Sequence, residues 1–259
     1  MGTTPRVNRT RRAIVIAAVI GATVMAGNTR TQAQASFSLS HFAVEFSNCV
    51  ESIGVTLAAT ADVRPSVPSP FVVVGEGQPV TPLVVRTARC GIAIDGGRVH
   101  RGEIVQVGAV IVPPDFTGDI NNYTIWYYTS DAFLALRLAL AGVHAQFVPT
   151  MDYDYHPGDS AFHVAVPLPG IPRLDLSGMV TPSSQSAGSF LANWWQLTPS
   201  GIVKMGTDVP VIDIGGGDLT LTTRAQGPLG QLIGGSSIGF PILQQFNTFV
   251  AAHMSVVRQ

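Results

Sequence analysis

The feature that most constrains the fold is a series of segments rich in β-branched and aromatic residues, separated by turn-forming residues. In the first of them Phe42, Val44 and Phe46 alternate with more polar neighbours, the pattern of a strand with one buried face. The turn-forming separators are VRPSVPSP, DGG and VPPDFTGD. We therefore expect the first half of the chain to form a β-sheet from HFAVEF (41–46), TPLVVRTARCGIAI (81–94), GEIVQVGAVIV (102–112) and NNYTIWYYT (121–129).

The second half mixes helix and strand signals. SDAFLALRLALAG (130–142) predicts a helix capped by Ser130 or Asp131 and ended by Gly142. Helical spacing also predicts a closing helix over 241–257, with an apolar face listed below. Further strands are expected in FHVAVPLP, RLDLSGMVT and PVIDIGGGDLTLTTR, the last as a hairpin around 215–217. The predicted closing face is Leu243, Phe246, Val250, Met254 and Val257.

The first 35 residues have the composition of a secretory signal peptide. A basic start, MGTTPRVNRTRR, precedes the apolar run AIVIAAVIGATVMAG and the small-residue sequence AQA, which ends at Ala35. We therefore expect one exported α+β domain over 36–259, located outside the cell, in the periplasm or in the cell envelope. No later stretch reaches the roughly 20 apolar residues of a spanning helix, so membrane insertion is not expected.

The charge balance limits the classes of partner. Five of the 15 basic residues lie in the first 35 positions, so ten basic residues face 16 acidic ones in the remainder. An acidic protein does not favour nucleic acid as a partner. The charged fraction is only 12%, and 27 glycines and 18 prolines are typical of a loop-rich β protein. The oligomeric state is not indicated.

Cys49 and Cys90 are the only cysteines. An even number in an exported chain favours a disulfide, and two buried free thiols are the alternative. Two cysteines are too few for the usual cysteine-rich structural zinc site.

Other motifs carry less information. Gly235–Gly239 matches G-x-S-x-G, but no acidic residue follows Ser237, as an α/β-hydrolase requires. MDYDYHPGD (151–159) places two aspartates and a histidine on one face of an extended segment, which is more often solvated than metal-binding. The single lysine, Lys204, is better explained as a solvated residue than as an imine-forming amine. We expect neither a metal nor a cofactor.

The order of elements resembles the acetoacetate decarboxylase-like family. The similar segments are VRPSVPSPFVV, TPLVVRTARC, HRGEIVQVG and the helix AFLALRLALAGVHAQFVP. The resemblance implies a β-rich cone or barrel-like sheet, flanked by helices, around an enclosed pocket. It also implies a small-molecule ligand or substrate.

The same resemblance suggests site residues. The family's reactive lysine falls at His144, which cannot form an imine, and its acidic positions fall near His100 and Arg86. The resemblance therefore implies acid/base catalysis by His144, His100 and Glu103, with Arg137 stabilising negative charge. Substrate contacts are expected from Arg86, Trp126, Trp194 and Trp195. In the alternative interpretation Arg137 reaches the surface and pairs with Asp131 or Asp152, His144 is exposed and the tryptophans fill a core.

Two functions follow from this. The first is an exported enzyme, a lyase or an isomerase, that acts on a small carbonyl or carboxylate compound without a Schiff base. The second is a secreted carrier of a hydrophobic small molecule. An enzyme's cavity would hold ionisable groups at depth, whereas a carrier's would be polar only at its mouth.

Overall fold

The structure, a computed structural model, describes residues 40–259 except 168–172, 184 and 187. The signal peptide expected over 1–35 lies outside the described residues. No helix within the described part combines the length and hydropathy needed to cross a membrane. The elements are β1 (His41–Ala59), α2 (Thr60–Val63), the short 3-10 helix η2 (Arg64–Ser66), β2 (Val80–Ile94), β3 (His100–Val110), β4 (Ile120–Thr129), α3 (Ala132–Ala141), β5 (Ala145–Phe147), β6 (Asp152–Asp154), β7 (Ala161–Val166), β8 (Leu174–Thr181), β9 (Phe190–Thr198), β10 (Gly201–Val209), β11 (Asp213–Thr222), α4 (Pro228–Ile233), β12 (Ser237–Gly239) and β13 (Leu243–Arg258).

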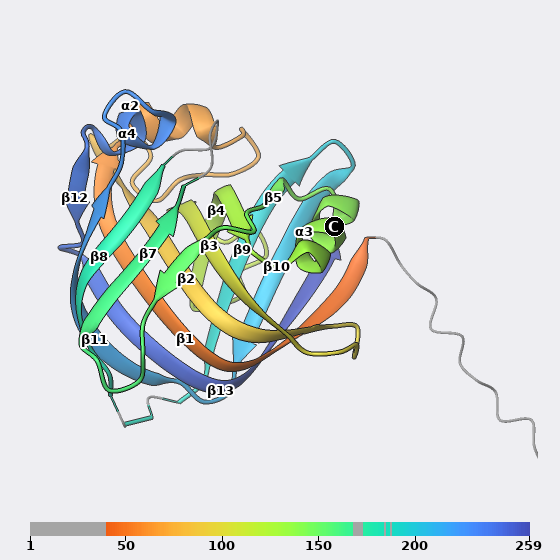
Figure 1. The fold of residues 1–259 in the computed structure, drawn as a ribbon. Helices are drawn as coiled ribbons and strands as arrows, with labels where there is room; N and C mark the ends of the chain where they lie inside the picture. Colours follow the sequence, from red (N-terminus) through yellow and green to blue (C-terminus); the bar gives the residue numbers. More distant parts are fainter. Residues whose placement is uncertain (1–39, 168–172, 184, 187) are drawn as a thin grey trace, which may run out of the picture. The chain divides into compact units, whose positions relative to one another are not determined.

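Seven strands close into a barrel in the order β1-β2-β3-β4-β9-β10-β13 (Figure 1). The barrel closes because β13 pairs with β1 along most of its length. Neighbouring strands are antiparallel except β4 and β9, which run parallel. The expected β-rich, barrel-like α+β fold is therefore confirmed.

A second group of strands, β6, β7, β8, β11 and β12, covers part of the barrel's outer face. It is continuous with the barrel through β11, whose first residues pair with β13 and whose later residues pair with β8. One apolar core lies between this sheet and the outward side chains of β2 and β3, such as Val85 and Val105. The other core fills part of the barrel interior.

Helix α3 closes one end of the barrel. As expected, the Asp131 side chain caps it, accepting a hydrogen bond from the Leu134 amide at 2.7 Å, and Gly142 ends it with φ of 94°. Leu134 and Leu138 belong to the interior core, and the Arg258 side chain at the end of β13 donates to the Ala141 carbonyl. The opposite end of the barrel carries the cavity described below.

The helix expected over 241–257 is wrong, because this segment forms β13. Its inward side chains alternate as far as Phe249 and then resume at Ala252 and Met254. This break in the alternation lies beside the register shift between Ser47 and Val50 in β1. The five residues expected on one helical face lie in different surroundings: Leu243 lines the cavity, Met254 belongs to the interior core, Phe246 belongs to the outer core, and Val250 and Val257 are exposed. A strand with apolar residues on both faces shows spacings of three and four, which imitate a helix.

The hairpin expected around 215–217 is also wrong, because β11 runs through these glycines without turning. At Gly215 a Cβ atom would lie 2.2 Å from the Thr181 carbonyl oxygen and 2.8 Å from that of Phe246. The missing side chain lets β11 pass between β13 and β8. The glycines therefore permit close packing of three strands.

The disulfide prediction is confirmed, because Cys49 and Cys90 are bonded at an S–S distance of 2.07 Å. The bond joins β1 to β2 next to the register shift, and both cysteines are buried.

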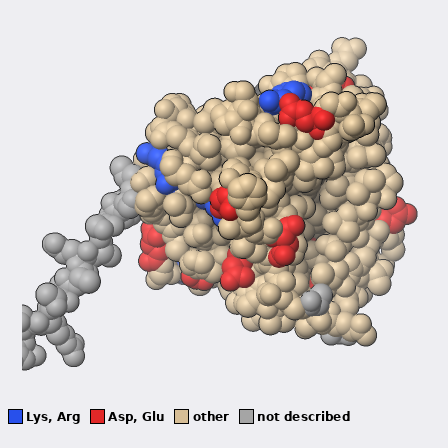
Figure 2. Space-filling model, turned by 180° about the vertical axis from the view of Figure 1, so that it is seen from behind, with Lys and Arg blue, Asp and Glu red and all other residues tan. Residues whose placement is uncertain are grey.

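Charged side chains are sparse on the surface. On the face shown in Figure 2, charged residues form small separate patches, some of them acidic beside basic, and most of the surface is uncharged. A cluster of like charges on this surface therefore indicates a candidate binding site.

Candidate functional site

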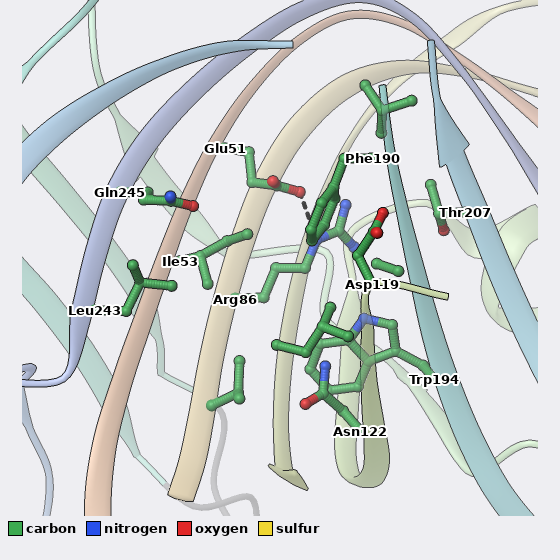
Figure 3. A pocket seen from close by; sticks show the side chains of 14 residues that line it. Glu51, Ile53, Arg86, Asp119, Asn122, Phe190, Trp194, Thr207, Leu243 and Gln245 are labelled. Atoms are coloured by element: carbon green, nitrogen blue, oxygen red, sulfur yellow. Dashed lines mark hydrogen bonds and ion pairs between the residues drawn. The ribbon is translucent and has the colours of Figure 1, made fainter. Parts of the chain in front are cut away.

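A cavity of about 210 Å³ lies inside the barrel, at the end opposite α3 (Figure 3). This volume is below the roughly 300–1,000 Å³ of sites for drug-sized ligands, so it suits a compact molecule. Its lining is mainly apolar. The lining side chains come from β1, β2, β4, β9, β10, β13 and the loop before β4: Glu51, Ile53, Val84, Arg86, Asp119, Ile120, Asn122, Phe190, Ala192, Trp194, Thr207, Val209, Leu243 and Gln245.

Four polar side chains form a hydrogen-bonded chain across adjacent strands of the wall, which we call the polar belt: Asn247, Glu51, Arg86 and Gln106. Asn247 Nδ2 donates to Glu51 Oε1 at 3.3 Å, and Arg86 Nε donates to Glu51 Oε2 at 2.5 Å. Arg86 Nη1 donates to Gln106 Oε1 at 2.6 Å. The register explains the order, because Asn247 lies opposite Glu51, and Gln106 lies opposite Arg86.

The ion pair within the belt is buried: the side chains of Arg86 and Glu51 are 9% and 6% exposed. A charge in such surroundings is tolerated only when it is paired and hydrogen-bonded, as both are here. Tyr127 is a third ionisable group nearby, directly opposite Gln106 on β4. Burial raises the pKa of Tyr127 far above its usual value, so its phenol stays neutral.

The opposite wall offers further polar groups. Asn122 and Trp194 lie together there (Figure 3), and Asn122 is almost fully buried. Asn122 Oδ1 has no hydrogen-bond partner among the described residues. Asp119 lines the cavity as well, and its Oδ2 accepts a hydrogen bond from the Leu191 amide at 2.7 Å.

This arrangement suits proton transfer and binding of an oxygen atom. A carboxylate can accept a proton, and a guanidinium beside it can stabilise a developing negative charge on oxygen. An imine cannot form in the cavity, because Lys204 is the chain's only lysine and is committed elsewhere. Lys204 Nζ bonds Asp115 Oδ2 at 2.6 Å and Thr117 Oγ1 at 2.7 Å, and it lies over the Trp195 ring.

The structure brings two of the predicted substrate-contact residues, Arg86 and Trp194, to this cavity. Trp195 instead belongs to the core outside the barrel, where its Nε1 donates to Asn121 Oδ1 at 2.8 Å. Trp126 packs against that outer core too. Adjacent strand residues point to opposite faces, so Trp194 and Trp195 could not both line one cavity.

The predicted acid/base residues lie elsewhere. His100 and His144 are both exposed, and neither lines the cavity. Glu103 is hydrogen-bonded to Ser130 Oγ, also away from the cavity. The expected meeting of His100 and His144 across a pocket does not occur there, because α3 fills the barrel end near which they lie.

Arg137 is buried but also outside the cavity. Its Nη2 donates to Asp95 Oδ2 at 2.8 Å, and its guanidinium lies 4.6 Å from the centre of the Phe42 ring. Asp95 belongs to the turn between β2 and β3, so this ion pair joins α3 to that turn. The surface partners considered from the sequence, Asp131 and Asp152, are not involved in this pair.

Sequence reasoning missed three members of the polar belt: Glu51, Gln106 and Asn247. A polar residue on the buried face of a strand would have been the signal. In β1, however, the inward positions are even-numbered up to Phe46 and odd-numbered from Cys49 onward. The register shift between Ser47 and Val50 reverses the faces, so simple alternation from Phe42 places Glu51 outside.

The described residues contain no group of three or more His, Cys, Asp or Glu side chains placed to hold a metal ion. Within MDYDYHPGD, Asp154 contacts His156 Nδ1 at 3.4 Å on the surface.

No protein-family model and no curated protein sequence matches this chain. Several solved structures have a similar fold. The enduracididine biosynthesis enzyme MppR, with HEPES buffer bound, is 15% identical, with 85% of each chain covered and a TM-score of 0.52. A structure from structural studies of acetoacetate decarboxylase is 10% identical, with 83% of this chain and 87% of that chain covered and a TM-score of 0.55.

An acetoacetate decarboxylase-like enzyme from Sphingomonas wittichii RW1 is also 10% identical, with 86% and 94% of the chains covered and a TM-score of 0.51. Likeness at such low identity concerns the fold alone. The chain has the acetoacetate decarboxylase-like fold.

Proposed function

We propose that this protein is an enzyme that moves a proton on a small carbonyl or carboxylate compound bound inside the barrel, without forming an imine. The observation that carries this proposal is the Glu51–Arg86 ion pair, buried in the wall of a small and otherwise mainly apolar cavity. Ionisable groups at depth are typical of a catalytic cavity rather than a storage cavity.

In the proposed reaction Arg86 donates a hydrogen bond to the carbonyl or carboxylate oxygen of the substrate. Glu51 accepts a proton from the neighbouring carbon atom, and the electron pair left behind moves onto the oxygen as an enolate. The protonated Glu51 exchanges its proton with water and delivers a proton back to a carbon atom of the enolate, so the protein ends unchanged. Arg86 favours the enolate because its positive charge lies where negative charge develops.

The fold gives the proposal independent support. One similar structure is MppR complexed with the condensation product of pyruvate and imidazole 4-carboxaldehyde, with a TM-score of 0.52. That neighbour therefore binds a small product of carbonyl chemistry. The two chains are only 14% identical, so the substrate of this protein is to be identified by experiment.

Hydrogen exchange in deuterated water tests the proposal directly. The protein is incubated with a panel of short 2-oxo and 3-oxo carboxylic acids, and loss of the proton signal next to the carbonyl is followed by NMR. We expect exchange above the rate without protein for at least one compound, and a loss of about 100-fold or more in Glu51→Gln.

Glu103→Gln is the matched control, because it removes a carboxylate outside the cavity and should exchange like the wild type. Equal loss in both variants, or no exchange with any compound, would contradict the proposal. If Glu51→Gln fails to fold, the double variant Glu51→Gln/Arg86→Gln removes both charges together and serves the same purpose.

A second candidate is the carrier, favoured by the apolar residues that line much of the cavity, among them Ile53, Phe190, Val209 and Leu243. A carrier would retain a hydrophobic molecule through purification and catalyse no exchange. Native mass spectrometry of protein from its own host distinguishes the two functions, because the retained molecule would add a defined mass that disappears on denaturation.

We also propose that the protein is exported. The signal-like composition of residues 1–35 supports this, as does the Cys49–Cys90 disulfide, because such bonds persist in oxidising compartments. Cell fractionation with N-terminal sequencing tests it. The expected result is an extracytoplasmic protein beginning at Ser36, and a cytoplasmic protein with an intact N-terminus would overturn it.

A further inference from the structure

A second concave site lies on the outer face of the barrel. It is an open groove of about 600 Å³, a volume typical of small-molecule sites. Arg86 and Arg89 lie three positions apart on β2, so their side chains point to opposite faces, and the groove is distinct from the barrel cavity. The groove is lined by Ser47, Asn48, Val50, Arg89, Cys90, Gly91, Val99, Arg101, Tyr155, His156 and Pro157.

Arg89 is held in one orientation. Its Nη1 donates to the Tyr153 carbonyl at 3.0 Å and its Nη2 to the Tyr155 carbonyl at 2.6 Å. The guanidinium also lies 4.9 Å from the centre of the Tyr153 ring. Carbonyl oxygens orient this cation without neutralising it, so it loses little freedom when it meets an anion.

The groove brings together two basic side chains that form no ion pair. Four basic side chains elsewhere, Arg64, Arg86, Arg137 and Lys204, form ion pairs with Asp or Glu, whereas Arg98, Arg173, Arg224 and Arg258 form none among the described residues. Neither Arg89 nor Arg101 forms an ion pair within the described part of the chain, and Arg101 is exposed.

The acidic residues near the groove are engaged with other groups or exposed to water. Glu103 is half-buried and lies opposite Arg89 in the register; it accepts a hydrogen bond from Ser130, but a hydroxyl donor does not cancel the charge of a carboxylate, so Glu103 offsets part of the positive charge of the two arginines. Asp154 pairs with His156, and both are well exposed. Asp159, near Tyr155, is exposed too. Water screens the exposed charges of Asp154 and Asp159 strongly, so two arginines face one half-buried carboxylate and the groove stays attractive to an anion.

We propose that this groove binds a small organic anion, with a carboxylate or phosphate group between Arg89 and Arg101 and an apolar body against Val99, Tyr155 and Pro157. Guanidinium groups are the side chains best suited to such oxyanions. The apolar residues beside them favour a molecule larger than an inorganic ion. The site is independent of the reaction proposed for the barrel cavity.

Titration of the full-length folded protein with benzoate, phenyl phosphate and the uncharged benzyl alcohol tests the proposal. Binding is followed by NMR shifts of the Gly91 and Val99 amides, which belong to the groove. We expect at least one anion to shift these amides saturably, whereas benzyl alcohol does not. Which of the two anions binds more tightly identifies the preferred group.

Two variants locate the site. Arg101→Met should weaken anion binding about tenfold, since it removes a charge-assisted contact. Arg98→Met, three residues earlier and outside the groove lining, should change it less than twofold. Equal weakening in both variants would indicate diffuse attraction and overturn the proposal. So would equal binding of benzyl alcohol, or no shift with either anion at millimolar concentration.

Discussion

At the scale of single residues, two ion pairs differ in their surroundings. Arg86 and Glu51 face the cavity and are almost fully buried, whereas Lys204 and Asp115 lie on the outer side with 18% and 25% of their side chains exposed. The first pair is therefore strongly coupled, and the second is partly screened by water. Of these residues the sequence analysis named Arg86, because the family resemblance places a site position near it, and Lys204, because it is the only lysine.

Removing Arg86 alone should lower the free energy of unfolding more than removing both members of the buried pair. Arg86→Met leaves the Glu51 charge in an apolar wall, and we expect a loss of about 3–5 kcal/mol in the free energy of unfolding. Glu51→Leu/Arg86→Met, which leaves no charge behind, should be more stable than Arg86→Met. Urea unfolding of both variants measures this, and an additive, larger loss in the double variant would contradict it.

The Lys204–Asp115 pair predicts a pH dependence. Burial raises the pKa of Asp115, but hydrogen bonds from Lys204 and Thr117 outweigh it, and the net pKa lies below 3.8. A carboxyl group whose pKa is lower in the folded protein than in the unfolded chain stabilises the fold at pH values above its unfolded pKa. This stabilisation is lost as the pH falls through the folded pKa. The free energy of unfolding of the wild type should exceed that of Asp115→Asn by about 1 kcal/mol at pH 6. This difference should shrink below pH 4. An advantage that grows on acidification would refute this.

At the scale of elements, α3 shows what periodicity can and cannot decide. Its existence and both ends were predicted, since capping chemistry is local. Its buried side was not, because nearly every position is apolar. Phe133, Leu136 and Leu140 are about half exposed, whereas Arg137 is 1% exposed and paired with Asp95. Packing of Leu134 and Leu138 in the barrel core and the pairing of Arg137 with Asp95 in a distant turn define the inner side, and neither contact is visible in the local sequence.

Two leucines of α3 form a matched test of this orientation. Leu138 is fully buried and Leu140 is 42% exposed. We expect Leu138→Ala to lose about 2–5 kcal/mol of unfolding free energy, because it leaves a void in the barrel core. Leu140→Ala should change it by about 0.5 kcal/mol or less. Thermal or urea unfolding of the two variants decides, and similar losses would mean that α3 is oriented differently.

At the scale of the whole molecule, closing the barrel joins β1 to β13, which lie at opposite ends of the described chain. The cavity wall depends on this pairing, because Glu51 on β1 contacts Asn247 on β13 only across it. The disulfide supports the same region by joining β1 to β2 across a sequence separation of 41.

Removing the disulfide should therefore lower the stability of the entire barrel. We expect the double variant Cys49→Ser/Cys90→Ser to lose about 3–4 kcal/mol, the loop-closure contribution expected for this separation. Adding a reductant should not destabilise the variant further, which separates loss of the bond from other effects of the reagent. Equal unfolding midpoints for variant and wild type in urea would show that the bond contributes little.

The sequence by itself determined the strand-rich composition, helix α3 with its caps, the cysteine pair and the family-like order of elements. These depend on interactions within a few residues, or on residue types present in small number. The tertiary structure alone decided the strand at 243–258, the straight passage of β11 through its glycines, and the cavity with Glu51 in its wall. The physical reason is shared: which face of a strand is buried, and how closely its neighbours approach, are set only when distant strands pair, as the register shift in β1 and the close approach of β8 and β13 at Gly215 show.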